Sequence, residues 1–246
     1  MSDTSPSTKA PSLFVTTRWS VVLAAQDKAS PDSAAAWETL CRTYWYPLYA
    51  YVRHQGHSPH DAQDLTQEFI ARFLAKDYLK AADREKGHFR TFLRVALKRF
   101  LLNEWDRVKA LKRGGGHAIV SFDTEVAEAK YQTEAHGKPS EQVYEREWAM
   151  ALLQKTMADL RGEYERAGKT NEYERLKNCL TADRGTISYG QIATDLGMSE
   201  GAARVAVHRL RKRFREVFRE AVADTVSEAT EVDDEVRYVV GLLSQG

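Results

Sequence analysis

The sequence predicts an all-α protein with two small helical bundles joined by a flexible linker, the second bundle containing a helix-turn-helix. Three observations lead to this prediction. Nearly every patterned segment repeats apolar residues at three- and four-residue spacing, which is the period of a helix with one buried face. No segment of useful length alternates apolar and polar residues as a half-buried strand does. A polar stretch without sustained period, residues 114–140, separates the two sets of helices.

The composition limits the class of protein. The 246 residues are 43% hydrophobic and 29% charged, which is enough apolar material for real cores and enough charge for solubility. The N-terminal stretch SLFVTTRWSVVLAA is interrupted by Arg18 and lacks the layout of a signal peptide, and no run is long enough to cross a bilayer. Cys41 and Cys179 lie far apart on apolar helical faces and are expected to be reduced core thiols. We therefore expect a cytoplasmic protein without a membrane partner.

The charges are strongly segregated although the net charge is only +1. Ten basic and three acidic residues lie between Arg84 and Arg113, and seven basic residues and one acidic residue lie between Arg204 and Arg219. The last segment, Glu220 to Gly246, has seven acidic residues and one Arg. Two basic segments and an acidic tail indicate surfaces with different partners.

The first bundle, residues 13–113, follows a Ser-, Thr- and Pro-rich segment, residues 1–12, that is expected to lack fixed structure. Its first strongly periodic helix contains Pro47, which predicts a kink or an interruption. A turn at HQGHSPH precedes a second helix with one apolar and one acidic side. A charged loop then leads into a long helix, Phe89 to about Lys112, with basic residues at steps of four.

The second bundle, residues 141–222, begins near Glu141 with helices whose inward residues include Trp148, Leu152 and Leu160. An acidic extension, residues 223–246, follows it and mixes acidic with apolar residues in the manner of a short extra helix. One hypothesis is that this helix folds back over the basic helix before it and restrains binding to free DNA. The alternative is a solvated or partner-bound tail.

Residues 187–215, ISYGQIATDLGMSEGAARVAVHRLRKRFR, have the pattern of a helix-turn-helix. Ser188 and Gln191 have the spacing of a capping box at the start of the first helix. Gly197 suits a left-handed helix end, and Ser199 is placed to cap the second helix. The second helix has an apolar stripe for the core and a neighbouring basic stripe. Such a basic face can lie along phosphates with its first residues on base edges.

Both bundles resemble a known family. AWETLCRTYWYPLYAYVRHQGHSPHDAQDLTQEFIARFL, followed by GHFRTFLRVALKRFLLNEWDR, resembles region two of bacterial RNA polymerase sigma factors of the extracytoplasmic-function (ECF) type, with DAQDLTQEF as the most specific part. The helix-turn-helix segment is similar to region four of that family, and TTRWSVVLAA also resembles its members. The matches cover about residues 35–113 and 142–222, in the family's order.

The resemblance implies a protein that binds core RNA polymerase and helps to open promoter DNA. It places region two on the minus-ten element and the opened non-template strand, and region four on the double-stranded minus-thirty-five element. An anti-sigma protein is a further candidate partner. The resemblance implies no catalytic residue, metal or cofactor.

The resemblance also implies which residues contact each partner. An acidic face suits a polymerase surface that holds nucleic acid, and it is formed by Asp61, Asp64, Gln67 and Glu68. Basic, polar and aromatic side chains suit the minus-ten segment, and they are Arg90, Arg94, Lys98, Arg99, Asn103, Trp105 and Arg107. The minus-thirty-five contacts fall on Ser199, Arg204, His208, Arg209, Arg211 and Lys212.

Some positions depart from the family pattern and leave the promoter sequence open. Phe92 stands where a Trp is frequent, and Val205 and Ala206 stand where Ser and Arg are common. The charged loop Asp77 to His88 matches the family region that captures a flipped base, but its sequence is too variable to assign contacts.

Two other functions fit the same patterns. A stand-alone helix-turn-helix repressor or activator would use the N-terminal bundle as a sensor and bind its operator without polymerase. Alternatively, the basic helices would dock an acidic protein partner. The spacing of His54, His57 and His60 suggests a metal site only weakly, because Gly56 and Pro59 interrupt the helical face. No nucleophile, base and orienting group cluster at a recognisable spacing, which argues against an enzyme.

Overall fold

The computed structural model describes residues 19–27, 31–75, 78–83, 87–110, 124–134 and 139–244, so the segment 1–12 lies outside the described residues. All regular structure in these ranges is helical, as predicted. The α-helices are α1 (Trp19–Gln26), α2 (Ser33–His54), α3 (Pro59–Ala75), α4 (Phe89–Ala110), α5 (Thr124–Glu134), α6 (Ser140–Arg166), α7 (Thr170–Leu176), α8 (Tyr189–Leu196), α9 (Glu200–Ala223) and α10 (Val232–Ser244). The 3-10 turns are η1 (Tyr78–Ala81), η3 (Lys177–Leu180), η4 (Arg184–Thr186) and η5 (Ala229–Glu231).

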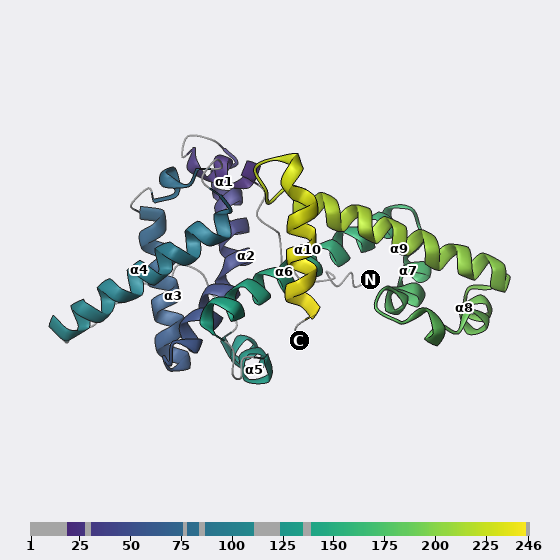
Figure 1. Ribbon diagram of the computed structural model, residues 1–246, viewed down its shortest axis with the longest axis horizontal. Coiled ribbons are helices and arrows are strands. Elements are labelled where there is room, and N and C mark those ends of the chain that lie inside the picture. The colour runs from purple at the N-terminus through teal and green to yellow at the C-terminus, as the bar shows by residue number, and fades with distance from the viewer. Residues whose placement is uncertain are drawn as a thin grey trace, which may run out of the picture.

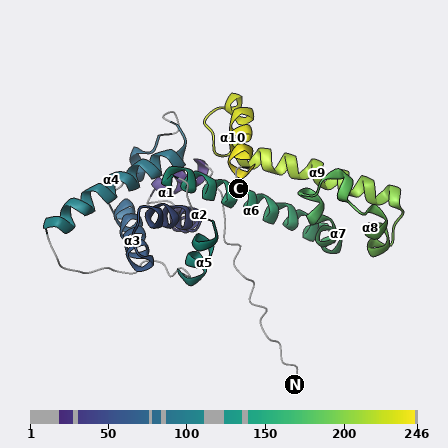
Figure 2. The same cartoon turned by 60° about the horizontal axis from the view of Figure 1, so that its bottom comes forward.

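The helices form an elongated molecule with a larger bundle at one end and a smaller one at the other (Figure 1). Helices α1 to α5 lie at the first end, α7 and α8 lie at the second, and α6 and α9 run between them (Figures 1 and 2). Helix α10 lies across the middle of the molecule (Figure 1). The C-terminal end of α4 projects away from the larger bundle in both views. The helix-turn-helix and α4 are therefore at opposite ends.

Two hydrophobic cores correspond to the two bundles, but both bundles share helices. The first core contains side chains from α1 to α5, from the N-terminal half of α6, from the C-terminal end of α9 and from α10. The second contains side chains from the C-terminal half of α6, from α7 and η3, and from the middle of α9, with α8 packed against it. The predicted division into bundles at residues 13–113 and 141–222 needs correction, because α6 and α9 belong to both cores.

Part of the predicted linker, residues 114–140, is a packed helix. Helix α5 buries Ala127 and attaches to α2 through Glu128. The carboxylate of Glu128 accepts hydrogen bonds from Arg53 Nη2 at 2.7 Å and from the Tyr49 hydroxyl at 2.7 Å. The hydrogen bond from Arg53 is the main cause that lowers the pKa of Glu128 to about 2. Polar contacts rather than a wide apolar stripe hold this helix, which is why the hydrophobic period did not predict it.

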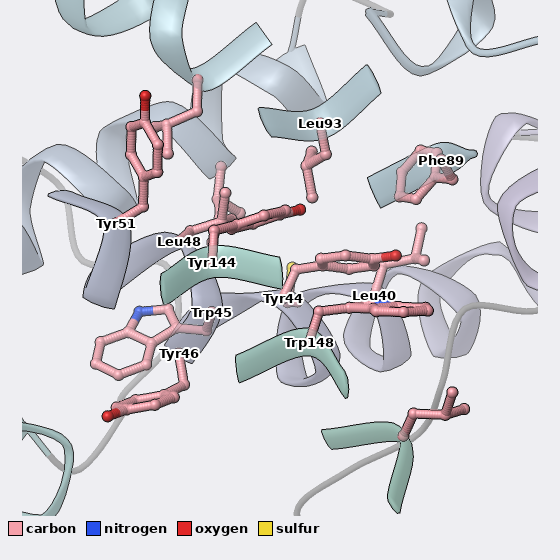
Figure 3. Close-up of a cluster of buried hydrophobic side chains, with 14 of the residues drawn as sticks. Leu40, Tyr44, Trp45, Tyr46, Leu48, Tyr51, Phe89, Leu93, Tyr144 and Trp148 are labelled. Atoms are coloured by element: carbon pink, nitrogen blue, oxygen red, sulfur yellow. The ribbon is translucent and has the colours of Figure 1, made fainter. Parts of the chain in front are cut away.

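Aromatic side chains from α2, α4 and α6 fill the first core (Figure 3). Tyr144 and Trp148 of α6 are 0% and 1% exposed, which makes the first half of α6 a core helix. The Tyr144 hydroxyl donates a hydrogen bond to the carbonyl oxygen of Arg90 at 3.0 Å and so joins α6 to the start of α4. Helix α2 runs through Pro47 without the interruption that the sequence suggested.

Both cysteines are buried and free, as the sequence predicts. Burial raises the pKa of the Cys41 thiol to about 11, and it also raises the pKa of Cys179. Both side chains therefore stay protonated thiols and behave as small apolar core residues.

Candidate nucleic-acid interface

Helices α8 and α9 form the predicted helix-turn-helix. Gly197 ends α8 with φ of +63°, a left-handed conformation that favours glycine. The Met198 amide donates to the Ala193 carbonyl oxygen at 2.9 Å and closes the end of the helix. The Ser199 hydroxyl accepts a hydrogen bond from the Ala202 amide at 3.2 Å and caps α9. The turn and the second cap are therefore confirmed.

The predicted capping box at the start of α8 is wrong. Ser188 occupies the N-cap position, but its side chain makes no capping hydrogen bond. The side-chain Nε2 of Gln191 instead donates a hydrogen bond to the Asp195 carboxylate at 2.8 Å, one turn further along the helix. Helix α8 is held in place by Ile192 and Leu196, which pack against the second core.

Helix α9 has one buried and one exposed face near its start, as the sequence predicts. Ala203, Val207 and Leu210 are at most 2% exposed. The exposed face carries five of the six residues predicted to contact the minus-thirty-five element: Ser199, Arg204, His208, Arg209 and Lys212. At the two departures from the family pattern, Val205 is exposed and Ala206 is buried in the second core. The outer face thus combines cations, a hydroxyl and one exposed apolar side chain.

Arg204 is held in position by contacts within the helix-turn-helix. Its guanidinium donates to Glu200 Oε1 at 2.6 Å and lies 4.3 Å from the centroid of the Tyr189 ring. The side chain is still 59% exposed. Arg204 therefore stands at the junction of α8 and α9, with donor groups directed to solvent.

Arg211 is half-buried and has a structural role that its prediction as a DNA contact did not include. Its Nε donates to the Cys179 carbonyl oxygen at 2.8 Å, and its Nη2 donates to the Ala182 carbonyl oxygen at 2.5 Å. The guanidinium thereby fixes the end of η3 and the chain that follows. Carbonyl groups at a helix end need donors, and Arg211 supplies two of them.

Arg213 has a role that sequence reasoning missed. Its guanidinium makes two hydrogen bonds to the Glu163 carboxylate, at 2.7 and 2.8 Å, and joins α9 to α6. These bonds raise the pKa of Arg213 and lower that of Glu163. Nothing in the sequence distinguishes Arg213 from the basic residues beside it. The packing of α6 against α9 determines which side of α9 faces Glu163.

Arg90 is the clearest correction among the predicted minus-ten residues. It is only 4% exposed, whereas a residue that contacts DNA needs an accessible guanidinium. It forms salt bridges with Glu145 of α6 at 2.8 Å and Glu235 of α10 at 2.7 Å. The cost of desolvating a buried guanidinium explains why two carboxylates surround it. In this arrangement Arg90 connects three helices.

The remaining predicted minus-ten residues become more exposed toward the C-terminal end of α4. Arg94 is 24% exposed and lies 3.6 Å from Glu145, whereas Lys98 is 61% exposed and lies 3.5 Å from Glu141. Arg99 and Asn103 are exposed. The side chains of Trp105 and Arg107 lie outside the described residues, although the backbone of α4 continues to Ala110.

A pocket of about 390 Å³ lies between α3, η1 and α4. Its apolar wall consists of Phe69, Phe73, Ala81, Phe92, Ala96 and Phe100, and its polar groups are Arg72, Arg99 and Asn103. Arg72 is held by Glu68 and by Glu104, each at 2.6 Å, so it is a fixed part of the wall. This volume is within the range of small-molecule pockets, and aromatic walls with a few polar groups suit a flat heterocycle.

The predicted polymerase-binding residues lie along α3. Asp61 and Asp64 are exposed, whereas Gln67 and Glu68 are half-buried. The Ser58 hydroxyl accepts a hydrogen bond from the Asp61 amide at 3.1 Å and donates to its carboxylate at 2.7 Å, so Asp61 also supports the start of α3. Asp64 lies 3.3 Å from His60 and is otherwise directed to solvent. The acidic face is therefore most accessible at Asp61 and Asp64.

Two of the three histidines considered as metal ligands, His54 and His60, have separate surroundings. His54 lies against the Tyr131 ring, with the hydroxyl 3.5 Å from Nδ1, whereas His60 lies beside Asp64. Among the residues that the structure describes, no group of three or more His, Cys, Asp or Glu side chains is arranged to hold a metal ion. None of the described helices has the length and apolarity needed to span a membrane.

Comparison with protein-family models, with curated proteins and with solved structures finds no match to this chain. The evidence for a function therefore consists of the residues themselves and of the two sequence segments that resemble ECF sigma factors.

Proposed function

We propose that this chain is a sigma factor of the ECF type that binds core RNA polymerase, recognises the minus-ten and minus-thirty-five promoter elements and promotes opening of the duplex. The observation that carries the proposal is the exposed face of α9, because five of the six residues predicted to contact the minus-thirty-five element lie on one accessible side of a helix-turn-helix. A stand-alone repressor would have the same exposed face on its recognition helix. The features that favour a sigma factor over a repressor therefore have to come from the first bundle.

The helix-turn-helix supports reading of the double-stranded minus-thirty-five element. The N-terminal part of a recognition helix enters the major groove, where Arg is able to bind the O6 and N7 atoms of guanine together. Arg204 has the position and exposure for this contact. Arg209 and Lys212 lie further along the exposed face, where cations bind phosphates.

The pocket beside α4 supports capture of unstacked DNA. Opened DNA presents bases that are free to stack on aromatic rings, and phosphates that bind cations. Arg99 and Asn103 stand at the polar part of the pocket, and Lys98 lies exposed on the same helix. We infer that one base of the opened minus-ten element occupies the pocket while the exposed cations bind the neighbouring backbone.

The acidic face of α3 supports binding to polymerase. Asp61 and Asp64 are accessible, and their charge is opposite to that of a protein surface that binds nucleic acid. With α3 on the polymerase, α4 is left for DNA. A protein with this function works in the cytoplasm beside the polymerase.

One transcription experiment tests this proposal. Purified protein is added to core polymerase that lacks sigma, and start sites are mapped on a broad promoter library. The proposal requires initiation at defined positions that share sequences near minus ten and minus thirty-five. The absence of initiation, together with tight binding to duplex DNA without polymerase, would reject it and favour a stand-alone repressor or activator.

A further inference from the structure

The recognition face is the exposed side of the first half of α9, and helix α10 leaves it uncovered. Its members are Gly201, Arg204, Val205, His208, Arg209 and Lys212. Helix α10 packs on the first core, where Val232 and Val239 are at most 5% exposed. Near the C-terminal end of α9, Arg219 forms an ion pair with Asp233 of α10. The hypothesis that the acidic extension covers the recognition face is therefore wrong, because α10 lies at the opposite end of α9 from Arg204 (Figure 1).

Val205 is the apolar exception on the recognition face. It is 48% exposed, and no other large apolar side chain among the described residues of α8 and α9 is exposed to this degree. Of the two positions that depart from the ECF pattern, Ala206 is buried in the second core and only Val205 faces outward. Val205 therefore contributes little to the fold and is accessible to a partner.

Cationic side chains lie on both sides of Val205. Successive residues of an α-helix are turned by about 100°, so Val205 points about 140° away from buried Leu210. In the same projection Arg204 lies about 100° to one side of Val205, and Arg209 lies about 40° to the other. An apolar side chain thus stands between cations on the accessible surface.

Gly201 leaves space beside Val205. It lies four residues before Val205, which places it one turn away on the same side of α9. A Cβ atom at Gly201 would meet only the Ser199 Oγ, at 4.0 Å, so packing within the protein does not require a glycine here. Glycine is also a poor helix former. The missing side chain allows the backbone of α9 to approach a surface that Val205 contacts.

The charges around Val205 favour a polyanion over an apolar protein surface. Arg204 is 59% exposed, Lys212 is 67% exposed, and Arg209 is also exposed. An apolar protein surface placed on Val205 would desolvate these cations without supplying partners for them. The major groove of DNA supplies phosphates for the cations and base edges for the side chains between them.

The side chain of Val205 has no hydrogen-bond donor or acceptor, and this limits which base edge it is able to recognise. Thymine is the base that presents an apolar group, its C5-methyl, in the major groove. Contact between valine and this methyl group removes apolar surface from water on both sides. Contact with the amino group of cytosine or with O6 of guanine would instead leave a polar group without a partner. Val205 should therefore favour thymine and disfavour those bases.

We propose that Val205 is a specificity-determining residue that binds the C5-methyl group of a thymine in the minus-thirty-five element. The identity of the element rests on the proposed function, whereas the contact itself requires only that α9 enters a major groove. Arg204 directly precedes Val205, so the thymine should lie within about two base pairs of the guanine that Arg204 binds.

Replacement of thymine by deoxyuridine tests this contact, because it removes the methyl group and keeps the hydrogen bonds of the base pair. The preferred sequence is first selected from a randomised duplex library with the full chain, both free and bound to core polymerase. Each thymine of that sequence is then replaced singly by deoxyuridine, and the affinities are compared by competition. One replacement should weaken binding of the parent chain about three- to tenfold.

Val205→Ser should bind the thymine and deoxyuridine duplexes with equal affinity, because the apolar contact is lost. Serine and valine have similar helix propensities, and position 205 is exposed, so this variant should fold. Val205→Thr keeps one of the two methyl groups and should keep part of the discrimination. Val240→Ser is the matched control, since Val240 is a 51% exposed valine of α10 outside the recognition face. It should discriminate between the two duplexes as the parent chain does.

Two results would overturn the contact. The first is a parent chain for which no deoxyuridine replacement weakens binding. The second is an equal thymine preference in Val205→Ser and the parent chain.

Failure of the contact and failure of the proposed function give different results. If core polymerase initiates with this chain but no thymine responds to deoxyuridine, the sigma function stands and the methyl contact is rejected. If polymerase does not initiate, but the free chain has a thymine preference that Val205→Ser abolishes, the sigma function is rejected and the contact stands. A chain that binds no duplex, free or with polymerase, rejects both.

Discussion

The guanidinium of Arg90 lies over the ring of Trp148, with 4.0 Å between the guanidinium carbon and the ring centroid. Arg90 is the second residue of α4 and Trp148 belongs to the first half of α6, so this contact joins the two segments that resemble different sigma regions. Cations over an indole face are favourable, and more so when both groups are desolvated. The contact shows that the first half of α6, which belongs to the segment similar to region four, packs in the core formed by the segment similar to region two.

Trp148 is therefore expected to be essential for the stability of the first core. Trp148→Ala should lower the free energy of unfolding by about 3–5 kcal/mol, because it removes a buried aromatic side chain and leaves a cavity. Trp148→Phe should cost less, since it keeps most of the apolar volume. Urea unfolding followed by circular dichroism measures both, with Leu23→Ala as a control at a 52% exposed position. Equal stability of Trp148→Ala and the control would contradict the packing described.

Glu128 predicts how the attachment of α5 depends on pH. Its pKa in the folded protein is about 2, below the usual 4.5, so its contribution to stability is complete above about pH 4.5 and is lost as the pH falls toward 2. Glu128→Gln should therefore lower the melting temperature near pH 7. It should also make the melting temperature fall less between about pH 7 and pH 3. Glu125→Gln, at an exposed position of α5, should leave both unchanged. Parallel pH curves for Glu128→Gln and the parent chain would refute this.

Hydrophobic spacing predicted the all-α class because wide apolar stripes leave a clear period in the sequence. It identified α2, α3, α4 and both helices of the helix-turn-helix. It missed α5, since Glu128 and Arg53 hold that helix through polar contacts. It also placed a boundary before α6, because periodicity reports that a face is buried but not which core buries it. Trp148 and Leu160 are both inward residues, yet they belong to different cores.

Hydrophobic spacing also predicted the exposure of some site residues and not of others. Spacing on α9 correctly separated exposed Arg204 from buried Val207, because both faces belong to one helix. Spacing did not show that Arg90 is buried, because its partner Glu235 comes from a distant segment. It also did not show that Arg211 binds the carbonyl oxygen of Cys179. A basic stripe in a sequence does not show which of its members the fold itself uses.

Asp64 should contribute to polymerase binding without contributing to the fold. Asp64→Lys should weaken binding to core polymerase about tenfold or more, because a like charge then faces the basic surface proposed as its partner. Its stability should change by no more than about 0.5 kcal/mol, as at most exposed sites. Glu38→Lys is the matched control, since Glu38 and Asp64 are 62% and 64% exposed and each has a partner on its own helix. Equal affinities for the two variants would remove α3 as the polymerase surface.

Arg211 should act on the local fold rather than on DNA. Arg211→Ala leaves two carbonyl groups without their donors and should cost about 1–3 kcal/mol of stability. Arg211→Lys should restore only part of this, because an ammonium does not reproduce the planar fork of the guanidinium. Hydrogen exchange should increase around residues 177–186. A loss of DNA affinity without faster exchange in this segment would instead identify Arg211 as a DNA contact.

Arg204 should determine the sequence preference at one position of the minus-thirty-five element. Arg204→Ala should lower the binding free energy for the preferred DNA sequence by about 1–3 kcal/mol and that for other sequences by less. The preference for one base at the contacted position should therefore relax. Lys212→Ala is the control, since Lys212 is 67% exposed and is proposed to bind phosphate. Lys212→Ala should weaken binding to all DNA sequences equally. It should also reduce the number of ions released on DNA binding, and hence the salt dependence of the affinity, by about one. Transcription from a library randomised around minus thirty-five measures both variants. An identical profile for Arg204→Ala and the parent chain would show that Arg204 reads no base, and the preference would then have to come from Ser199, His208 or exposed Val205.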